Sequence, residues 1–423
     1  MPGIKLAIIG AGSSYTPELI EGIAKKKDKL PIQKISLMDI NENRLKVMTA
    51  FCQRYLAYLG CENIEVEATT DRRKAIEGAD FIDLQIRVGG NKARINDEKI
   101  PLKYGLVGQE TTGAGGFMKA LRTIPVMLEI AKDIESCSPE AWVINYTNPS
   151  GLITEALTKH SKLKIAGFCS IGILPQVWAR DVLGAKPEEV RYDYVGLNHL
   201  NFAFNIKING RPISEAELIK IGEAVNVVDI ELIKALKMLP APYLQYYYHT
   251  SKVVKELKEA PKTRGEIVQD LEREVFSAYK DEHQFTKPEA LAKRGGGGYS
   301  EVAMGFMNAI YNDEDHWMIV NVPNQGAIKF LPDDAVVEIG CLVNKTGIHP
   351  LVVEKIPSAI WGLIAAVKNY ETLAVEAAVT GDRTTALLAL VAHPLVRDYN
   401  LAKPLLDELV EANRNYLPTF FKD

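Results

Sequence analysis

A glycine-rich segment near the N-terminus has the residue types that bind a phosphate group through the backbone. Gly10-Ala11-Gly12-Ser13-Ser14 follows an apolar run at residues 5–9, and Thr16-Pro17-Glu18 then has the features of a helix start, with Thr16 as the candidate N-cap. Glycines in such a turn let backbone N–H groups approach a pyrophosphate at a helix N-terminus. The third glycine of the full dinucleotide motif is absent, so this segment alone also fits an ordinary strand–helix turn.

An acidic residue at the end of the next apolar run favours the dinucleotide interpretation. Asp39 lies 27 residues after Gly12, at a position where a carboxylate accepts hydrogen bonds from both hydroxyls of an adenosine ribose. A carboxylate there repels a 2′-phosphate, so we predict NAD rather than NADP as the cofactor. The predicted cofactor-binding residues are Gly10, Gly12, Ser13, Ser14 and Asp39.

The elements that must position these residues alternate along the first two hundred positions. Short apolar runs typical of buried strands are separated by segments such as residues 43–59, whose apolar positions recur with the period of an amphipathic helix. This alternation predicts an α/β fold with a Rossmann-like, doubly wound parallel sheet. The predicted strands are residues 5–9, 34–38, 64–68, 81–86, 142–146 and 164–168.

The pattern changes after about residue 195. Residues 201–208 alternate between apolar and polar side chains, and Asn209-Gly210 then predicts a type I′ turn. A further strand is expected at residues 335–343, and long helices at 357–379 and 401–416. We therefore predict a nucleotide-binding domain at residues 1–195 and a mixed α+β domain for substrate binding and oligomerisation at residues 196–423.

Composition excludes several classes of protein. The 423 residues are 47% hydrophobic and 25% charged, as in globular proteins, and the net charge of −4 does not favour nucleic acid or an anionic membrane. The five cysteines contain no C-x-x-C pair, which argues against a disulfide scaffold or a four-cysteine zinc site. No apolar run is long enough to span a bilayer or has a signal peptide's cleavage pattern. We expect a cytoplasmic protein.

Unusual polar or glycine-containing segments follow the predicted strands. In doubly wound folds the ligand-binding crevice lies at the carboxyl ends of the strands, so these segments are expected to line it. They are residues 87–90 together with Arg94, and residues 108–113, 145–149, 167–170 and 196–199.

Taken in this order, the segments resemble glycoside hydrolase family 4, and most closely its 6-phospho-β-glucosidases. The resemblance covers essentially the whole chain and implies a fold like that of lactate and malate dehydrogenases. The motifs that carry it are GAGSSYTPEL (10–19), IPLKYGLVGQET (100–111), NYTNPSG (145–151), GLNHL (196–200), PYLQYYY (242–248), KRGG (293–296) and AAVTGD (377–382).

The resemblance implies hydrolysis of 6-phospho-β-glucosides, such as phosphorylated cellobiose or aryl glucosides, with NAD and a divalent metal, usually Mn²⁺. Family 4 departs from the two-carboxylate scheme of most glycosidases. NAD⁺ takes a hydride from C3 of the sugar, a base removes the acidified C2 proton, and the aglycone leaves C1. Water then adds and the hydride returns. Members of the family are usually homodimers or homotetramers.

The resemblance also assigns roles to single residues. Cys169 and His199 match the metal ligands, and Tyr243 matches the base that removes the C2 proton. Taken alone, Cys169 fits a buried core thiol, and Tyr243 cannot be distinguished from the neighbouring tyrosines at 246–248. Asn148, Arg94 and Arg264 match substrate-binding residues of the family. Arg87 and Glu110 are expected to line the same cleft.

Two positions depart from the family pattern. Ser170 follows the metal cysteine where relatives usually carry Asn or Asp; it can donate a hydrogen bond but is a poor acid at neutral pH. Asn321-Val322-Pro323-Asn324 stands where relatives usually have N-T-R-N, so one arginine is missing. Together these departures leave three properties open: the proton donor, the efficiency on poor leaving groups and the sugar itself. Residues 295–298 fit a loop over the site and a plain loop equally well.

Three alternatives to a 6-phospho-β-glucosidase stay open. The first is a family 4 glycosidase with another sugar or anomeric specificity. The second is a net oxidoreductase of the lactate/malate dehydrogenase type, against which the Cys169/His199 pair argues, and the third is a non-catalytic sensor of NAD and a sugar phosphate, which Ser170 makes conceivable.

Overall fold

The main sheet begins with six parallel strands in the order β3-β2-β1-β4-β5-β6. The computed structural model describes residues 3–295 and 297–421. This strand order is that of the dinucleotide-binding doubly wound sheet, with its switch point between β1 and β4. The strands, all of them predicted, are β1 (Ile4–Ile9), β2 (Ile32–Met38), β3 (Glu65–Thr69), β4 (Phe81–Leu84), β5 (Trp142–Asn145) and β6 (Lys164–Gly167).

Helices connect these strands. The helix predicted at residues 43–59 is α2, whose N-cap Asn41 accepts a hydrogen bond from the Arg44 amide. The prediction of Thr16 as an N-cap was wrong: Tyr15 occupies that position, and the Thr16 hydroxyl donates to the Ala11 carbonyl at 2.8 Å. The helices are α1 (Thr16–Lys25), α2 (Glu42–Tyr58), α3 (Arg72–Ile76), α4 (Gly90–Lys103), α5 (Gly113–Cys137) and α6 (Ser150–His160).

Three strands from the second half of the chain extend the same sheet. β11 (His316–Pro323) pairs antiparallel with β6, and β12 (Val336–Asn344) and β13 (Gly347–Pro350) follow outward, giving nine strands. The strand predicted at residues 335–343 is therefore confirmed as β12. The two halves share one sheet, and the division predicted after residue 195, which falls inside β7, stays a prediction.

A smaller antiparallel sheet has its own apolar core, formed with α7 (Leu174–Leu183), α8 (Glu215–Val225) and α9 (Ile230–Leu236). Asn209 and Gly210 have φ values of 49° and 78°, which confirms the predicted type I′ turn between β8 and β9. The strands are β7 (Val190–Leu197), β8 (Leu200–Ile208), β9 (Arg211–Pro212) and β10 (Leu239–Pro240).

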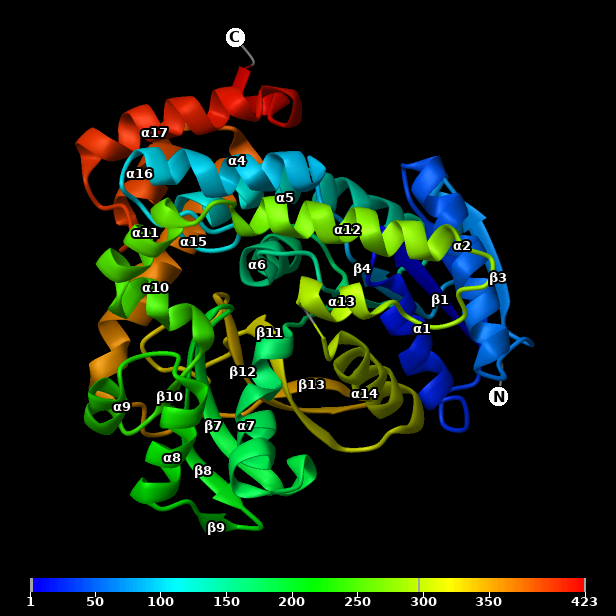
Figure 1. The fold of residues 1–423 in the computed structure, drawn as a ribbon, viewed down its shortest axis with the longest axis horizontal. Coiled ribbons are helices and arrows are strands. Elements are labelled where there is room, and N and C mark those ends of the chain that lie inside the picture. Colours follow the sequence, from blue (N-terminus) through cyan, green and yellow to red (C-terminus); the bar gives the residue numbers. More distant parts are fainter. Residues whose placement is uncertain (1–2, 296, 422–423) are drawn as a thin grey trace.

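The remaining helices pack mainly against other helices. Figure 1 shows α12 running beside α4 towards α2, and α12 packs against both. The two predicted C-terminal helices are confirmed as α15 and α17. None of the helices described is long and apolar enough to cross a membrane. The helices of the second half that follow α9 are α10 (Gln245–Tyr248), α11 (Thr250–Glu259), α12 (Arg264–Lys280), α13 (Glu289–Arg294), α14 (Tyr299–Asn312), α15 (Trp361–Thr380), α16 (Arg383–Ala392) and α17 (Tyr399–Ala412).

A buried ion pair holds α4 against α5 behind the crevice. The Arg122 guanidinium donates to both Asp97 oxygens at 2.7 and 2.6 Å, and both side chains are fully buried. Arg122 also donates to the Val88 carbonyl at 3.0 Å, so the pair fixes the segment that enters α4.

We expect Asp97→Asn to lower the free energy of unfolding by about 3–5 kcal/mol, because it leaves the Arg122 cation buried without a counter-charge. Urea unfolding measures this. The matched control is Asp133→Asn on α5, whose carboxylate pairs with the more exposed Arg72 and Arg73 and which should cost at most about 1 kcal/mol. Equal losses in the two variants would contradict the role given to burial.

Candidate active site

The turn between β1 and α1 has the shape that its glycines predict. The Gly12 amide donates to Asp39 Oδ2 at 2.8 Å, and Gly10 has φ 94°. A Cβ atom at Gly12 would lie 2.6 Å from Asp39 Oδ2, and one at Gly10 would lie 2.8 Å from the Gln85 carbonyl oxygen. Both glycines are therefore required for the close approach of β1, β2 and β4 that shapes the turn.

A groove of about 420 Å³ opens beside this turn, between α2 and α12. Arg44 forms part of its wall and donates to the Gly12 carbonyl at 2.8 Å, while its guanidinium lies 4.0 Å from the centre of the Phe276 ring. The groove thus lies next to Asp39, where the adenosine half of a dinucleotide is expected.

Glu272 of α12 connects the glycine turn to the second half of the chain. Its carboxylate accepts from the Ser14 hydroxyl at 3.3 Å, from Asn91 at 3.0 Å and from Arg294 at 3.1 Å. Burial raises the pKa of Glu272, but the charges of Arg294, Arg44 and Arg87 outweigh burial and hold it below its usual value. Sequence reasoning missed this residue, which lies in an ordinary charged helix.

The structure brings Cys169 and His199 together. Cys169 follows β6, and His199 lies in the two-residue turn between β7 and β8. Cys169 Sγ is 3.5 Å from His199 Nε2, and both side chains are buried. His199 has φ 67°, a left-handed conformation that costs a non-glycine residue roughly 1–3 kcal/mol and is found at functional sites. The predicted convergence of these two residues from separate strand ends is confirmed.

The electrostatics of this pair suit a cation. Burial, with a smaller effect from Lys119, lowers the His199 pKa to about 3, so the imidazole is neutral and a ring nitrogen lone pair is available. Burial and the Glu338 charge raise the Cys169 pKa to about 12, so the thiol keeps its proton until a cation replaces it. Within residues 3–295 and 297–421, no cluster of three or more His, Cys, Asp or Glu side chains could hold a metal.

Tyr243 lies against the imidazole. Its ring stacks on His199 with centroids 4.0 Å apart and planes 3° from parallel, at the start of the short helical turn Pro242–Leu244. Burial, followed by the nearby Cys169, raises its pKa well above the usual range. A base at this position therefore needs a positive charge beside it. Of the four clustered tyrosines, Tyr243 is the one whose ring stacks on His199.

A compact charge cluster borders the site. Glu110 pairs with Arg87, with Arg94 at 3.0 Å and with Lys119 at 2.8 Å. Burial raises the pKa of Glu110, but Arg87, Lys119 and Arg94 hold it well below its usual value. Burial, and next Arg87, lowers the Lys119 pKa to about 7. Lys119 was missed, although it is one of two charges in the otherwise uncharged stretch 113–124 at the start of α5.

Two other predicted substrate residues, Asn148 and Arg264, differ in whether their polar atoms already have hydrogen-bond partners. Asn148 donates to the Tyr146 carbonyl at 3.3 Å, while its buried Oδ1 has no hydrogen-bond partner among the residues described. The exposed Arg264 begins α12 and donates to the carbonyls of Lys293 and Arg294 at 2.9 and 2.8 Å. The free acceptor on Asn148 suits a sugar hydroxyl, whereas Arg264 already has partners.

Gly298, at the end of the glycine tract 295–298, lies close to Ser170. Ser170 begins the 3₁₀ turn Ser170–Ile173, and a Cβ atom at Gly298 would lie 3.9 Å from the Ser170 Cβ. The Gly298 amide donates to Glu18 at 2.8 Å, which ties the end of the tract to α1. Gly296 lies outside the described residues, so the loop prediction for 295–298 stays a prediction.

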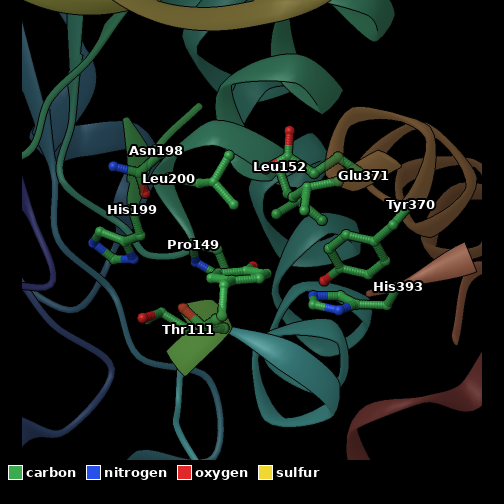
Figure 2. A pocket seen from close by; sticks show the side chains of 12 residues that line it. Thr111, Pro149, Leu152, Asn198, His199, Leu200, Tyr370, Glu371 and His393 are labelled. Carbon is green, nitrogen blue, oxygen red and sulfur yellow. The ribbon is translucent and has the colours of Figure 1, made fainter. Parts of the chain in front are cut away.

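A small cavity adjoins His199. Its volume of about 10 Å³ is close to the space of one water molecule, and Cys169 and Tyr243 are not among its lining residues. Figure 2 shows Asn198 and His199 on one side of it, with Tyr370, Glu371 and His393 on the other. His199 Nδ1 is buried without a hydrogen-bond partner among the described residues.

A Rossmann sheet with a glycine turn and an acidic residue after its second strand is typical of dinucleotide-binding proteins with the malate dehydrogenase type of fold, and here it is joined at one edge to a buried thiol–imidazole pair. The malate dehydrogenase of Cryptosporidium parvum has this fold, with a TM-score of 0.57 over 89% of this chain and 99% of that one; at 14% identity the likeness is one of fold.

The chain belongs to glycoside hydrolase family 4. The model for "Family 4 glycosyl hydrolase" matches residues 5–183, and that for the family's C-terminal domain matches residues 194–396.

Named relatives and solved structures agree with this family. A Bacillus subtilis relative with the name "Probable 6-phospho-beta-glucosidase" is 42% identical over 99% of this chain and 98% of its own length. The 6-phospho-β-glucosidase of Thermotoga maritima, solved with NAD and glucose-6-phosphate, has a TM-score of 0.93 at 36% identity, covering 98% of this chain and 99% of that one. A second structure of that enzyme, with manganese, NAD⁺ and glucose-6-phosphate, has a TM-score of 0.91.

Two buried imidazoles make stability depend on pH. Burial lowers the pKa of His393, as of His199, to about 3, and His393 Nδ1 accepts from the Leu395 amide at 3.0 Å. An unfolded histidine has a pKa of about 6.5, so between these values the unfolded chain binds a proton that the folded chain does not. The contribution of these two side chains to stability is therefore present above about pH 6.5 and is lost as the pH falls below it.

We expect His393→Gln to reduce the slope of unfolding free energy against pH by up to about 1.4 kcal/mol per unit between pH 6 and 4. Glutamine retains an acceptor for the Leu395 amide. Urea unfolding of metal-free protein at several pH values measures the slope. The control His349→Gln, which changes an exposed ring, should leave it unaltered. An unchanged slope in His393→Gln would contradict the prediction.

Proposed function

We propose that this protein hydrolyses 6-phospho-β-glucosides by transient NAD-dependent oxidation at C3 of the sugar, followed by removal of the C2 proton and elimination of the aglycone. The observation that carries the proposal is the buried Cys169–His199 pair, 3.5 Å apart, with Tyr243 stacked on His199 at the edge of a dinucleotide sheet. Relatives at 36–42% identity that have the name of 6-phospho-β-glucosidases favour the β-glucoside over the other specificities.

The residues present fit both cofactors of the solved relatives. Bound NAD⁺ supplies a reversible hydride acceptor, and a bound divalent metal, Mn²⁺ in our proposal, supplies a Lewis acid for the sugar oxygens. The amides of the turn at Gly10, Gly12, Ser13 and Ser14 would hold the pyrophosphate, and Asp39 would hold the ribose. Cys169 and His199 would hold the metal, with open positions for substrate.

Tyr243 is the proposed base for the C2 proton. Its burial keeps the phenol protonated in the absence of a nearby cation, so base strength would appear only with the metal site filled. Ser170, where relatives usually carry Asn or Asp, would donate a hydrogen bond to the leaving oxygen rather than a full proton, which favours aglycones that leave readily.

The charged residues around Glu110 are proposed to bind the substrate. Arg87 and Arg94, held at one carboxylate, present guanidinium groups whose geometry suits a 6-phosphate, and Glu110 fixes their positions. Asn148 would accept from a sugar hydroxyl through its free Oδ1. Arg264 would contribute by releasing its two carbonyl partners at the end of α13.

We further propose a cytoplasmic homodimer or homotetramer that binds a phosphorylated sugar and neither nucleic acid nor membrane. All five cysteines are free thiols, as a reducing compartment favours. Exposed apolar side chains that a subunit interface would cover include Leu351, Val352, Trp361, Leu388 and Tyr399.

The direct test is release of p-nitrophenol from p-nitrophenyl β-glucoside 6-phosphate. We expect turnover that requires NAD⁺ and Mn²⁺, stops on chelation and leaves no net NADH. Turnover without NAD⁺ or metal would rule the proposal out. Stoichiometric NADH would indicate a net oxidoreductase. Tight binding of glucose 6-phosphate without hydrolysis of either anomer or the C4 epimer would indicate a sensor.

We expect Tyr243→Phe to lower kcat by about 10²–10⁴-fold, because the ring is retained and the proton acceptor is lost. Affinities for NAD⁺ and Mn²⁺ should stay within twofold. Tyr246→Phe is the matched control: its ring lies 5.8 Å from that of Tyr243, and kcat should change only a few-fold. Equal effects of the two substitutions on kcat would remove Tyr243 from the assignment.

A further inference from the structure

Three asparagine side chains converge on one buried carboxylate below the Cys169–His199 pair. Glu338 of β12 is 1% exposed. Its Oε1 accepts from Asn321 at 2.9 Å and from Asn198 at 3.1 Å, and its Oε2 accepts from Asn201. None of the ion pairs in the described part of the chain involves Glu338. The carboxylate is thus satisfied by amides rather than by a cation.

One of these amides belongs to the element that carries Cys169. Asn321 lies on β11 directly opposite Glu338, and its Cα also pairs with Gly167 of β6. The Asn321 amide donates to the Gly167 carbonyl at 3.3 Å as well as to Glu338. Gly167 lies two residues before Cys169, so Glu338 and Asn321 fix where β6 ends.

The other two amides belong to the hairpin that carries His199. Asn198 precedes His199 in the turn, as Figure 2 shows, and Asn201 follows it on β8. Asn201 also donates to the Leu197 carbonyl at 3.1 Å and accepts from the Tyr194 hydroxyl at 2.6 Å. Glu338 therefore anchors both sides of a turn whose central histidine has a left-handed backbone.

We propose that Glu338 is a positioning residue that sets the separation of Cys169 Sγ and His199 Nε2, and so the affinity of the site for a divalent cation. The proposal rests on the assignment of Cys169 and His199 as metal ligands. The carboxylate joins two elements from different sheets, β6 through Asn321 and the β7–β8 turn through Asn198 and Asn201. This common acceptor thus links the strand that leads to Cys169 with the turn that carries His199.

A carboxylate suits this position better than an amide. Glu338 receives three N–H groups on two oxygens, and both oxygens accept. A glutamine would offer one accepting oxygen and turn an N–H₂ group towards at least one asparagine N–H₂ group. Either an asparagine must rotate or the hairpin must shift, and each changes the geometry of the ligand pair.

The test measures metal binding without turnover. Metal-free protein is titrated with Mn²⁺, and free Mn²⁺ is followed by electron paramagnetic resonance; Co²⁺ titration adds the thiolate-to-cobalt absorption band as a signature of the Cys169 bond. We expect Glu338→Gln to weaken Mn²⁺ binding about 10- to 100-fold and to diminish the cobalt band, as loss of outer-shell partners does elsewhere. NAD⁺ affinity should stay within twofold.

The control is Asn324→Ala, which removes another buried amide from the loop after β11. Asn324 donates to the carbonyls of Ile328, Leu331 and Pro332 and has no contact with the ligand pair. Mn²⁺ affinity that is unchanged in Glu338→Gln, or lowered equally in Asn324→Ala, would overturn the proposal. If Glu338→Gln does not fold, Asn321→Ala serves in its place and should weaken Mn²⁺ binding at least several-fold; an unchanged affinity would overturn the proposal.

Cys169→Ser separates this inference from the assignment on which it rests. If Cys169→Ser leaves Mn²⁺ affinity and the cobalt band unchanged, the ligand assignment itself fails. If Cys169→Ser abolishes both and Glu338→Gln alters neither, the ligands stand and the role of Glu338 fails.

Discussion

The pairing of β11 with the edge of β6 is the contact on which the active site depends. It is made at Gly167 and Asn321, and it is possible because Gly167 has no side chain: a Cβ atom there would lie 2.2 Å from Thr154 Oγ1 and 2.9 Å from the Asn321 Cβ. Through this contact the second half of the chain continues the dinucleotide sheet. It also brings β12, and with it Glu338, under the hairpin that carries His199.

Burial determines the chemistry of the side chains held there. It keeps the His199 imidazole neutral and the Cys169 thiol protonated, so binding of a cation would release a proton from the thiol. Near this pair, the same low polarity strengthens the attraction between Glu110 and its three cationic partners, and Glu110 stays ionised. One region of the protein thus holds a neutral thiol–imidazole pair next to a set of fixed charges.

The sequence predicted the parts of the fold that depend on local pattern. Six parallel strands, α2, the Asn209-Gly210 turn and the C-terminal helices follow from periodicity and turn chemistry, and family motifs led to Cys169, His199 and Tyr243. The antiparallel addition of β11–β13 was not predicted, because an apolar strand does not reveal its distant partner. Glu338 and Glu272 were missed for the same reason: each has partners more than 100 residues away, Asn198 for Glu338 and Ser14 for Glu272. Thr16 was misassigned because its hydroxyl donates to the Ala11 carbonyl, whereas an N-cap hydroxyl would accept from a helix amide.

The shared sheet has a consequence for how the chain is made. β6 is complete at Gly167, but its antiparallel neighbour begins at His316, about 150 residues later. At roughly 5–20 residues per second, a ribosome needs on the order of ten to thirty seconds to cross that interval. During that time the N-terminal sheet presents an unpaired edge, which is a template for pairing with other chains. The edge of β6 in the newly made first half therefore stays exposed until β11 emerges, and Cys169, which follows β6, acquires its final surroundings only then.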